Sequence, residues 1–117
     1  MRWLIFFLAL VCPRLLFAGT ASWYGDEFRG KAMANGQPFD PDAMTCASWF
    51  YPLGTKLVVT RKTPSIISMV VVTVTDRGPS RANVKKGRVI DLSEAAFKCL
   101  APLELGLVEV TVKKMEP

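Results

Sequence analysis

The chain contains no histidine, three cysteines and ten acidic residues in a length of 117. The lack of histidine excludes Ser-His-Asp and Cys-His catalysis, histidine-ligated zinc and any imidazole acid or base working near neutral pH. Three cysteines are too few for a four-cysteine zinc site. Proton transfer must therefore come from carboxylates, tyrosines, lysines or water, and we expect no metal and no cofactor.

The length and composition predict one folded domain, because two separate cores would be difficult to build from so short a chain. Half of the residues are apolar, which excludes a disordered chain. The net charge is +5, and no arginine-rich helix or aromatic RNA-binding signature accompanies it, so we expect no nucleic-acid partner. A mild basic excess favours an anionic surface such as cell wall or membrane headgroups.

The N-terminus is typical of a secretory signal peptide. Arg2 precedes the apolar run 3–12, and this run is too short to span a bilayer, which needs about 20 residues. Pro13 after the run argues against the alternative, a signal anchor. We therefore expect residues 1–18 to be removed, leaving residues 19–117 as an exported monomer without a membrane span, in the periplasm, the cell envelope or the medium.

Two cysteines, Cys46 and Cys99, remain once residues 1–18 and Cys12 are gone. Lipidation at Cys12 stays open, although Val11 before it fits a lipidation signal poorly. An even cysteine count in an oxidising compartment favours a disulfide. We predict a Cys46–Cys99 bridge, which would add about 4 kcal/mol to the free energy of unfolding. Two buried free thiols are the alternative.

Short β-branched runs separated by Gly and Pro turns fill the mature chain. Strands are expected at residues 20–24, 44–47 (a strand or a helical turn), 55–61, 66–75, 88–91 and 107–112. Residues 93–98 predict a short helix that Asp91 or Ser93 would cap, and we assign Asp91 to this structural role. Residues 81–87 are expected to form a loop. This pattern predicts a small, mostly β barrel, which also removes exposed strand edges.

Asp76, in the segment 70–79, is the first candidate for chemistry. Val70, Val72 and Val74 share one face of the predicted strand, and Asp76 falls on the same face. A carboxylate at the end of an apolar face is partly desolvated, which favours its protonated form and suits a general acid. The alternative is that Asp76 accepts backbone N–H bonds in the turn that follows.

Five sequence blocks occur in order along the chain. They are Ala21-Ser-Trp-Tyr-Gly25, Ala34-Asn-Gly36 with Phe39-Asp40, Pro52-Leu-Gly-Thr55, Val74-Thr-Asp-Arg-Gly-Pro79 and Gly87-Arg-Val-Ile-Asp-Leu-Ser93. Together they resemble the rare lipoprotein A family of bacteria over nearly the whole mature chain. The resemblance implies a six-stranded double-psi β-barrel with one or two short helices, a fold similar to that of expansin and barwin domains.

The resemblance further implies the bacterial envelope as location and peptidoglycan glycan strands as substrate and partner. Active members are lytic transglycosylases, which cleave after N-acetylmuramic acid and leave a 1,6-anhydro end without using water. One acid/base protonates the leaving oxygen while the sugar's own 6-hydroxyl attacks. The family's acid matches Asp76, and its Asp after Phe matches Asp40, which we expect to assist. A turn cap beside Pro41 is the alternative for Asp40.

Two positions depart from the family pattern, since Gln37 stands where the family has Glu and Ser48 where it has His. We still expect Gln37, Ser48 and Arg77 to contact substrate. The two replacements favour a second hypothesis, a non-catalytic polysaccharide-binding or expansin-like wall-loosening module. A third hypothesis is a secreted effector or inhibitor that keeps only the scaffold.

Flat side chains matter because sugar rings stack their apolar faces on them. Trp23 and Tyr24 are expected in the substrate groove, with core packing as the alternative. The consecutive aromatic residues 49–51 cannot all face inward, so at least one is expected at the surface. The basic residues of the segment 81–88 predict a solvated surface with some attraction to anionic wall polymers.

Overall fold

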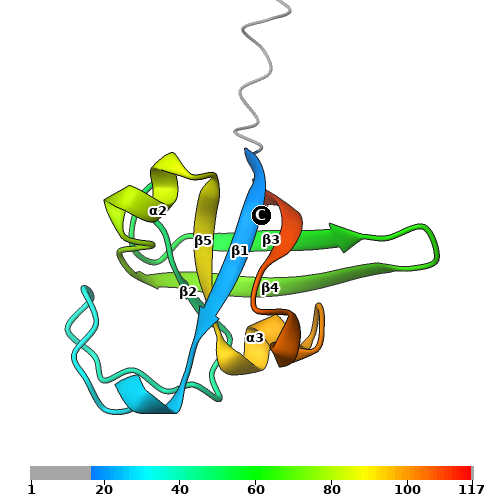
Figure 1. Ribbon diagram of the computed structural model, residues 1–117. Helices are drawn as coiled ribbons and strands as arrows, with labels where there is room; N and C mark the ends of the chain where they lie inside the picture. Colours follow the sequence, from blue (N-terminus) through cyan, green and yellow to red (C-terminus); the bar gives the residue numbers. More distant parts are fainter. Residues whose placement is uncertain (1–16, 117) are drawn as a thin grey trace, which may run out of the picture.

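The computed structural model describes residues 17–116, which form a closed barrel of six strands (Figure 1). The strands follow the order β1-β5-β2-β4-β3-β6 around the barrel. Their bounds are β1 Phe17–Tyr24, β2 Thr45–Ala47, β3 Lys56–Lys62, β4 Ile67–Asp76, β5 Arg88–Ser93 and β6 Val108–Lys114. Short helical segments connect them: the 3-10 turns η1 Asp26–Phe28 and η2 Leu103–Leu105, and the helices α2 Arg81–Lys85 and α3 Glu94–Lys98.

Strand pairing in the barrel is mixed. β1 runs parallel to β5 and β2 runs parallel to β4, whereas the other neighbours are antiparallel. A closed six-stranded barrel with two such parallel pairs is consistent with a double-psi β-barrel, and the predicted fold class is confirmed. Parallel pairs join strands from distant parts of the chain, because each needs a long crossover connection.

The barrel interior is filled by alternate residues of the strands. Val70, Val72 and Val74 of β4 are at most 8% exposed, whereas Val71 between them is 42% exposed. The alternation predicted from the sequence is therefore present. Each fully buried aliphatic side chain contributes roughly 1.5–3 kcal/mol to stability. The largest wholly buried side chains are Phe97, Leu57, Ile90, Leu92 and Val59.

Helix α3 begins after Ser93, whose hydroxyl accepts a hydrogen bond from the Ala96 N–H at 3.2 Å and donates one to the Ala43 carbonyl at 2.6 Å. Ser93 is therefore the cap, and the assignment of Asp91 as the cap is wrong. Asp91 lies two residues earlier, inside β5, where its side chain cannot reach the first turn. The segment expected to be a loop after Pro79 contains the short helix α2.

The predicted signal peptide lies mostly outside the described residues, and its cleavage site remains a prediction. Strand β1 begins at Phe17, so it includes Phe17 and Ala18 from the segment expected to be removed. Phe17 pairs with Val112 of β6, and its ring stacks on Phe50 with 4.7 Å between ring centroids. Within residues 17–116 no helix has the length and apolar character needed to cross a membrane.

Cys46 and Cys99 are free thiols, so the predicted disulfide is not formed in this structure. The reason lies in their positions. Cys46 is in β2 and is wholly buried in the core, whereas Cys99 follows the last turn of α3 and is exposed. The Cys99 thiol instead lies 3.5 Å from the carbonyl oxygen of Ala95. An even cysteine count could not reveal that the two side chains occupy different environments.

Candidate active site

Two carboxylates lie in one row across neighbouring strands. Ala47 of β2 is the register partner of Asp76 in β4 on one side and of Asp91 in β5 on the other. Because adjacent strands are about 4.8 Å apart, the two aspartate backbones are separated by about 10 Å with only alanine between them. Ser22 of β1 extends the row as the partner of Asp91. A register shift between Cys46 and Ala47 sets Asp76 opposite Ala47.

Asp91 is the carboxyl group whose surroundings perturb it most clearly. Burial raises the pKa of Asp91 above its ordinary value of 3.8, and the negative charge of Asp76 raises it further. A hydrogen bond donated by the Ser22 hydroxyl and the charge of Arg88 act in the opposite direction. The balance favours a carboxyl group that keeps its proton at higher pH than an exposed aspartate does.

Asp76 ends β4 and is held by two backbone groups. Its Oδ1 accepts hydrogen bonds from the N–H groups of Ala34 and Arg77, each at 2.9 Å. The turn contact considered from the sequence is therefore present, and it orients the carboxylate. The second oxygen, Oδ2, receives no hydrogen bond from residues 17–116, so it is free to face a ligand. The N–H of Asn35 also bonds to the Thr75 carbonyl at 3.1 Å, which fixes the loop 33–37, the covering loop, to the end of β4.

Tyr24 at the end of β1 completes the cluster. Its ring stacks on Phe39 with 4.3 Å between centroids and meets the Phe28 ring edge-on. Burial and the charges of Asp76 and Asp91 raise the pKa of the Tyr24 hydroxyl well above its usual range. This hydroxyl is buried and has no hydrogen-bond partner among the described residues. It is thus a neutral donor held beside two carboxyl groups.

Gly78 allows the loop after β4 to approach this row closely. A Cβ atom at position 78 would lie 3.3 Å from the Ala47 methyl and 3.4 Å from Asp91 Oδ2. A larger side chain there would press on both groups, whereas glycine leaves the space beside the carboxylate open. The sequence block Asp-Arg-Gly-Pro therefore contributes the carboxylate and also the backbone that lies over the neighbouring strand.

The side chains of Arg77 and Ser48 form hydrogen bonds that support the loop 48–51. One guanidinium nitrogen of Arg77 donates to the Ser48 carbonyl at 2.8 Å and to the Tyr51 carbonyl at 2.6 Å. Ser48 is 1% exposed, and its hydroxyl accepts from the Phe50 N–H at 3.1 Å. Because Ser48 is buried in this turn, the expectation that its side chain contacts substrate is not supported. Arg77 acts on the position of residues 48–51.

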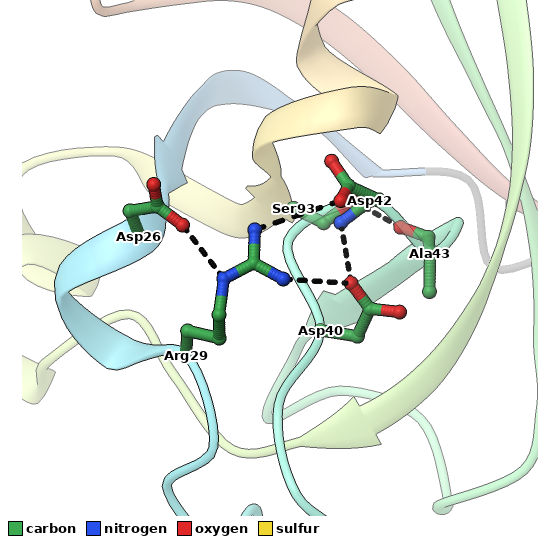
Figure 2. A network of polar contacts seen from close by, with 6 residues as sticks. All are labelled: Asp26, Arg29, Asp40, Asp42, Ala43 and Ser93. Atoms are coloured by element: carbon green, nitrogen blue, oxygen red, sulfur yellow. Dashed lines mark hydrogen bonds and ion pairs between the residues drawn. The ribbon is translucent and has the colours of Figure 1, made fainter.

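Asp40 belongs to a different set of charges, which Figure 2 shows. Arg29 bonds to Asp26 at 2.8 Å and lies 3.8 Å from Asp40 and 3.5 Å from Asp42. Asp40 also accepts a hydrogen bond from the Asp42 N–H at 2.9 Å, which is a turn contact. All four side chains are more than half exposed. The carboxylate that shares a row with Asp76 is Asp91 rather than Asp40.

The hydrogen bonds of Trp23 and Gln37 are made to groups outside the carboxylate row. Trp23 donates from its indole nitrogen to the Leu103 carbonyl at 3.1 Å and packs against the core beside Phe97. Adjacent strand residues point to opposite faces, which explains why Tyr24 reaches the site and Trp23 does not. Trp23 therefore shows the core packing considered as the alternative, and its role in a substrate groove stays a prediction. Gln37 is exposed in the covering loop, where its N–H bonds to the Asn35 side chain at 2.9 Å.

Sequence reasoning missed Asp91, Ser22 and Ala47. The sequence did contain a signal for Asp91, because this residue stands between the apolar residues Ile90 and Leu92. Both of these are wholly buried in the structure. A single carboxylate between two core residues of a strand must point to the opposite face. The pairing of Ser22 and Ala47 with Asp91 depends on strand order and register, which one sequence does not display.

These observations define the class of the protein. It is a double-psi β-barrel with two neighbouring carboxyl groups and a tyrosine hydroxyl that has no hydrogen-bond partner within residues 17–116. The protein-family model described as lytic transglycolase matches residues 16–112, and the chain belongs to this family.

Similar proteins are found among curated sequences and among solved structures. Endolytic peptidoglycan transglycosylase RlpA of Pseudomonas aeruginosa is 43% identical over 99 residues, which cover 85% of this chain and 27% of that protein. The chain thus spans about a quarter of that relative's length. The Streptomyces papain inhibitor matches with a TM-score of 0.63 and 30% identity over 86% of this chain and 94% of that chain. An expansin of Clavibacter michiganensis, at 24% identity and a TM-score of 0.64, covers 87% of this chain and 51% of its own and shares the fold.

Proposed function

We propose that this chain is exported to the cell envelope and cleaves peptidoglycan glycan strands as a lytic transglycosylase. The observation that carries the proposal is the row in which Asp91, with its raised pKa, and Asp76 lie on either side of Ala47. Paired carboxyl groups in different environments can divide acid and base work on a glycosidic bond. The RlpA relative's name states the same reaction for that protein.

Asp91 is the proton donor in this proposal. Its carboxyl group gives a proton to the glycosidic oxygen as the bond between that oxygen and the anomeric carbon breaks. The resulting Asp91 carboxylate then accepts the proton of the sugar's 6-hydroxyl while that oxygen bonds to the anomeric carbon. The products are a free hydroxyl end and a 1,6-anhydro end. No water is consumed, and Asp91 returns to its protonated form.

In the proposed reaction Asp76 acts through its negative charge and does not donate a proton to the glycosidic oxygen. Its carboxylate is oriented by the Ala34 and Arg77 N–H groups, and its free Oδ2 can face the positive charge that develops at the anomeric carbon. The Tyr24 hydroxyl is buried and stays neutral, so it adds no charge to the pair. In this proposal Asp91 takes the role of general acid that was expected for Asp76. Asp76 instead stabilises the positive charge at the anomeric carbon.

The test uses purified glycan strands without stem peptides. The wild-type protein should produce fragments with 1,6-anhydro ends, detected by mass spectrometry. The Asp91→Asn and Asp76→Asn variants should each lose at least about 100-fold in rate. Asp42→Asn is the matched control, because Asp42 is an exposed carboxylate outside the row. Asp40→Asn in the same assay tests the assisting role expected from the family resemblance.

Absence of anhydro fragments with the wild-type protein would contradict the proposal. Retained binding to the strands would then favour the non-catalytic binding or wall-loosening module. Fragments that end in a reducing sugar instead of an anhydro sugar would show hydrolysis, which also contradicts the proposed reaction.

A second candidate function is inhibition of a cysteine protease. It is supported by the match to the Streptomyces papain inhibitor, which this chain covers over 94% of its length. The test is the rate of papain hydrolysis of a chromogenic peptide at increasing concentrations of this protein. Inhibition unaffected by Asp91→Asn would assign this activity to a surface other than the carboxylate row.

A further inference from the structure

A pocket of about 540 Å³ lies between helix α2 and the loop 48–51. It is lined by two aromatic rings, two cationic side chains and one aliphatic side chain: Trp49, Phe50, Arg81, Lys85 and Val84. None of these residues was expected to belong to the catalytic cluster. The combination of flat apolar surface and positive charge nevertheless defines the chemistry of a ligand.

The aromatic part of the pocket is exposed yet fixed in place. Trp49 is 40% and Phe50 is 38% exposed, so both rings are open to a ligand. The Trp49 indole N–H donates to the Pro79 carbonyl at 2.6 Å, and the Phe50 ring stacks on Phe17. Rings held in this way present flat apolar surface without losing further conformational freedom when a ligand binds.

The cationic part of the pocket lacks a negative partner. The Arg81 guanidinium lies 4.7 Å from the centre of the Trp49 ring, and Lys85 is one helical turn further along α2 on the same face. Neither forms an ion pair with an acidic side chain in the described part of the chain, where the ion pairs found are those of Arg29. An anionic group entering the pocket would therefore meet two uncompensated positive charges.

The pocket is joined directly to the candidate active site. The Ser48 N–H donates to the Asp76 carbonyl at 3.0 Å, and Arg77 bonds to the carbonyls of Ser48 and Tyr51. The residues on either side of Trp49 and Phe50 are thus tied to the end of β4. The loop that carries the two rings is therefore anchored to the end of the strand that carries Asp76.

We propose that this pocket is a subsite for a sugar unit that bears a carboxylate. The apolar face of the pyranose ring lies against Phe50 and the exposed part of Trp49, and the carboxylate binds Arg81 and Lys85. The inference rests on the proposed function in one respect, that the polymer is a peptidoglycan strand. There the carboxylate comes either from the lactyl group of a muramic acid without its peptide or from the stem peptide itself.

The experiment measures binding by isothermal titration calorimetry in the Asp91→Asn background, so that cleavage does not interfere. Three ligands are compared: glycan oligomers with free lactyl carboxylates, peptide-bearing oligomers of equal length, and N-acetylglucosamine oligomers, which lack the carboxylate. We expect one or both of the first two to bind about tenfold more tightly than the third. Whichever binds more tightly identifies the source of the carboxylate.

Variants assign the binding to this pocket. Arg81→Gln should remove the preference for the acidic oligomer, while the affinity for the neutral oligomer stays the same. Phe50→Ala should weaken both. Lys86→Gln is the matched control, because Lys86 is the next exposed cation but does not line the pocket. Thermal unfolding of each variant shows that it is folded.

Equal affinity for acidic and neutral oligomers, or an equal loss in Arg81→Gln and Lys86→Gln, would overturn the subsite. Failure of the proposed function is separate, because it is read from anhydro fragments made by the wild-type protein. If the protein makes no fragments but prefers the acidic oligomer through Arg81, the subsite proposal is upheld and the proposed enzymatic activity is contradicted.

Discussion

The hydroxyl of Ser22 donates a hydrogen bond to the carboxylate of Asp91 and so links β1 to β5 at one end of the carboxylate row. Burial and this bond act on Asp91 in opposite directions. Burial raises the pKa of Asp91, whereas a donor facing the carboxylate favours its charged form. The Ser22 hydroxyl therefore offsets part of the effect of burial on the pKa of Asp91, and two of the predictions below follow from this arrangement.

The stability of the fold should depend on pH through Asp91. Its pKa is higher in the folded chain than its ordinary value of 3.8, so the unfolded state gives up this proton first as pH rises. The contribution of Asp91 is fully present below that value and is lost as pH rises through the folded pKa. The free energy of unfolding by urea, measured for wild type and Asp91→Asn, should therefore fall relative to the variant as pH increases. Parallel curves would show that burial does not perturb Asp91.

Replacing Ser22 by alanine should change both stability and the pH dependence of cleavage. Loss of a hydrogen bond to a charged group costs about 2 kcal/mol in the free energy of unfolding. Without that donor the pKa of Asp91 rises further, so the alkaline limb of the rate profile should move to higher pH. Ser22→Thr keeps a hydroxyl and should restore the wild-type limb. An unchanged limb in Ser22→Ala would exclude Asp91 as the acid.

Arg77→Met should loosen the loop 48–51 without touching the carboxylate row. The change keeps the aliphatic stem and removes the donor that serves the carbonyls of Ser48 and Tyr51. Two charge-assisted hydrogen bonds are lost, so the free energy of unfolding should fall by about 3 kcal/mol. Binding of acidic oligomers in the aromatic pocket should weaken as well. Lys86→Met, which removes an exposed cation, should leave both quantities unchanged.

The two described cysteines should differ strongly in reactivity. Burial raises the pKa of the Cys46 thiol well above its usual range, whereas Cys99 is exposed. Iodoacetamide labelling of the native protein, resolved by peptide mapping, should modify Cys99 quickly and Cys46 only after unfolding. Protection of Cys99 that disappears when a reductant is added would instead show the disulfide predicted from the sequence.

Gln37→Glu should raise the rate of glycan cleavage. The loop of Gln37 is attached to the end of β4, where the Ala34 N–H bonds to Asp76 and the Gln37 carbonyl accepts from the Met33 N–H. The change restores the acidic residue that the resembled family has at this position. We expect about a tenfold increase in rate, less than the roughly 10²–10⁴-fold that is typical of general acid–base catalysis, and a stability change within about 0.5 kcal/mol. The same rate for Gln37→Glu and Gln37→Ala would argue against this role.

The sequence predicted those parts of the structure that depend on local order. Alternation along β4 placed Val70, Val72 and Val74 in the core, and the ordered blocks led to the barrel. The sequence did not predict the surroundings of residues that depend on which strands pair with each other. Asp91 was assigned to a helix cap because Ser93 and Glu94 follow it, yet it lies inside β5 and faces Ser22 across a parallel strand pair.

The environments of Trp23 and of the cysteines were also beyond the reach of the sequence, for a related reason. Trp23 and Tyr24 are both aromatic, so the sequence of β1 does not show which of them faces the core. Only the contacts of Trp23 with Leu103 and Phe97 decide this. Likewise, the count of cysteines holds no information on the burial of Cys46 in the barrel and the exposure of Cys99 beside α3.

The position of β1 in the barrel has a consequence for biosynthesis. Its neighbours are β5 and β6, the last two strands of the chain (Figure 1). A nascent chain therefore emerges from the ribosome with its first strand unpaired, and the barrel can close only after residue 108 has been made. Contacts between such distant segments form late and slowly. During synthesis the segment that precedes β6 is thus held without a closed barrel, and β1 gains its second neighbour only when β6 has been made.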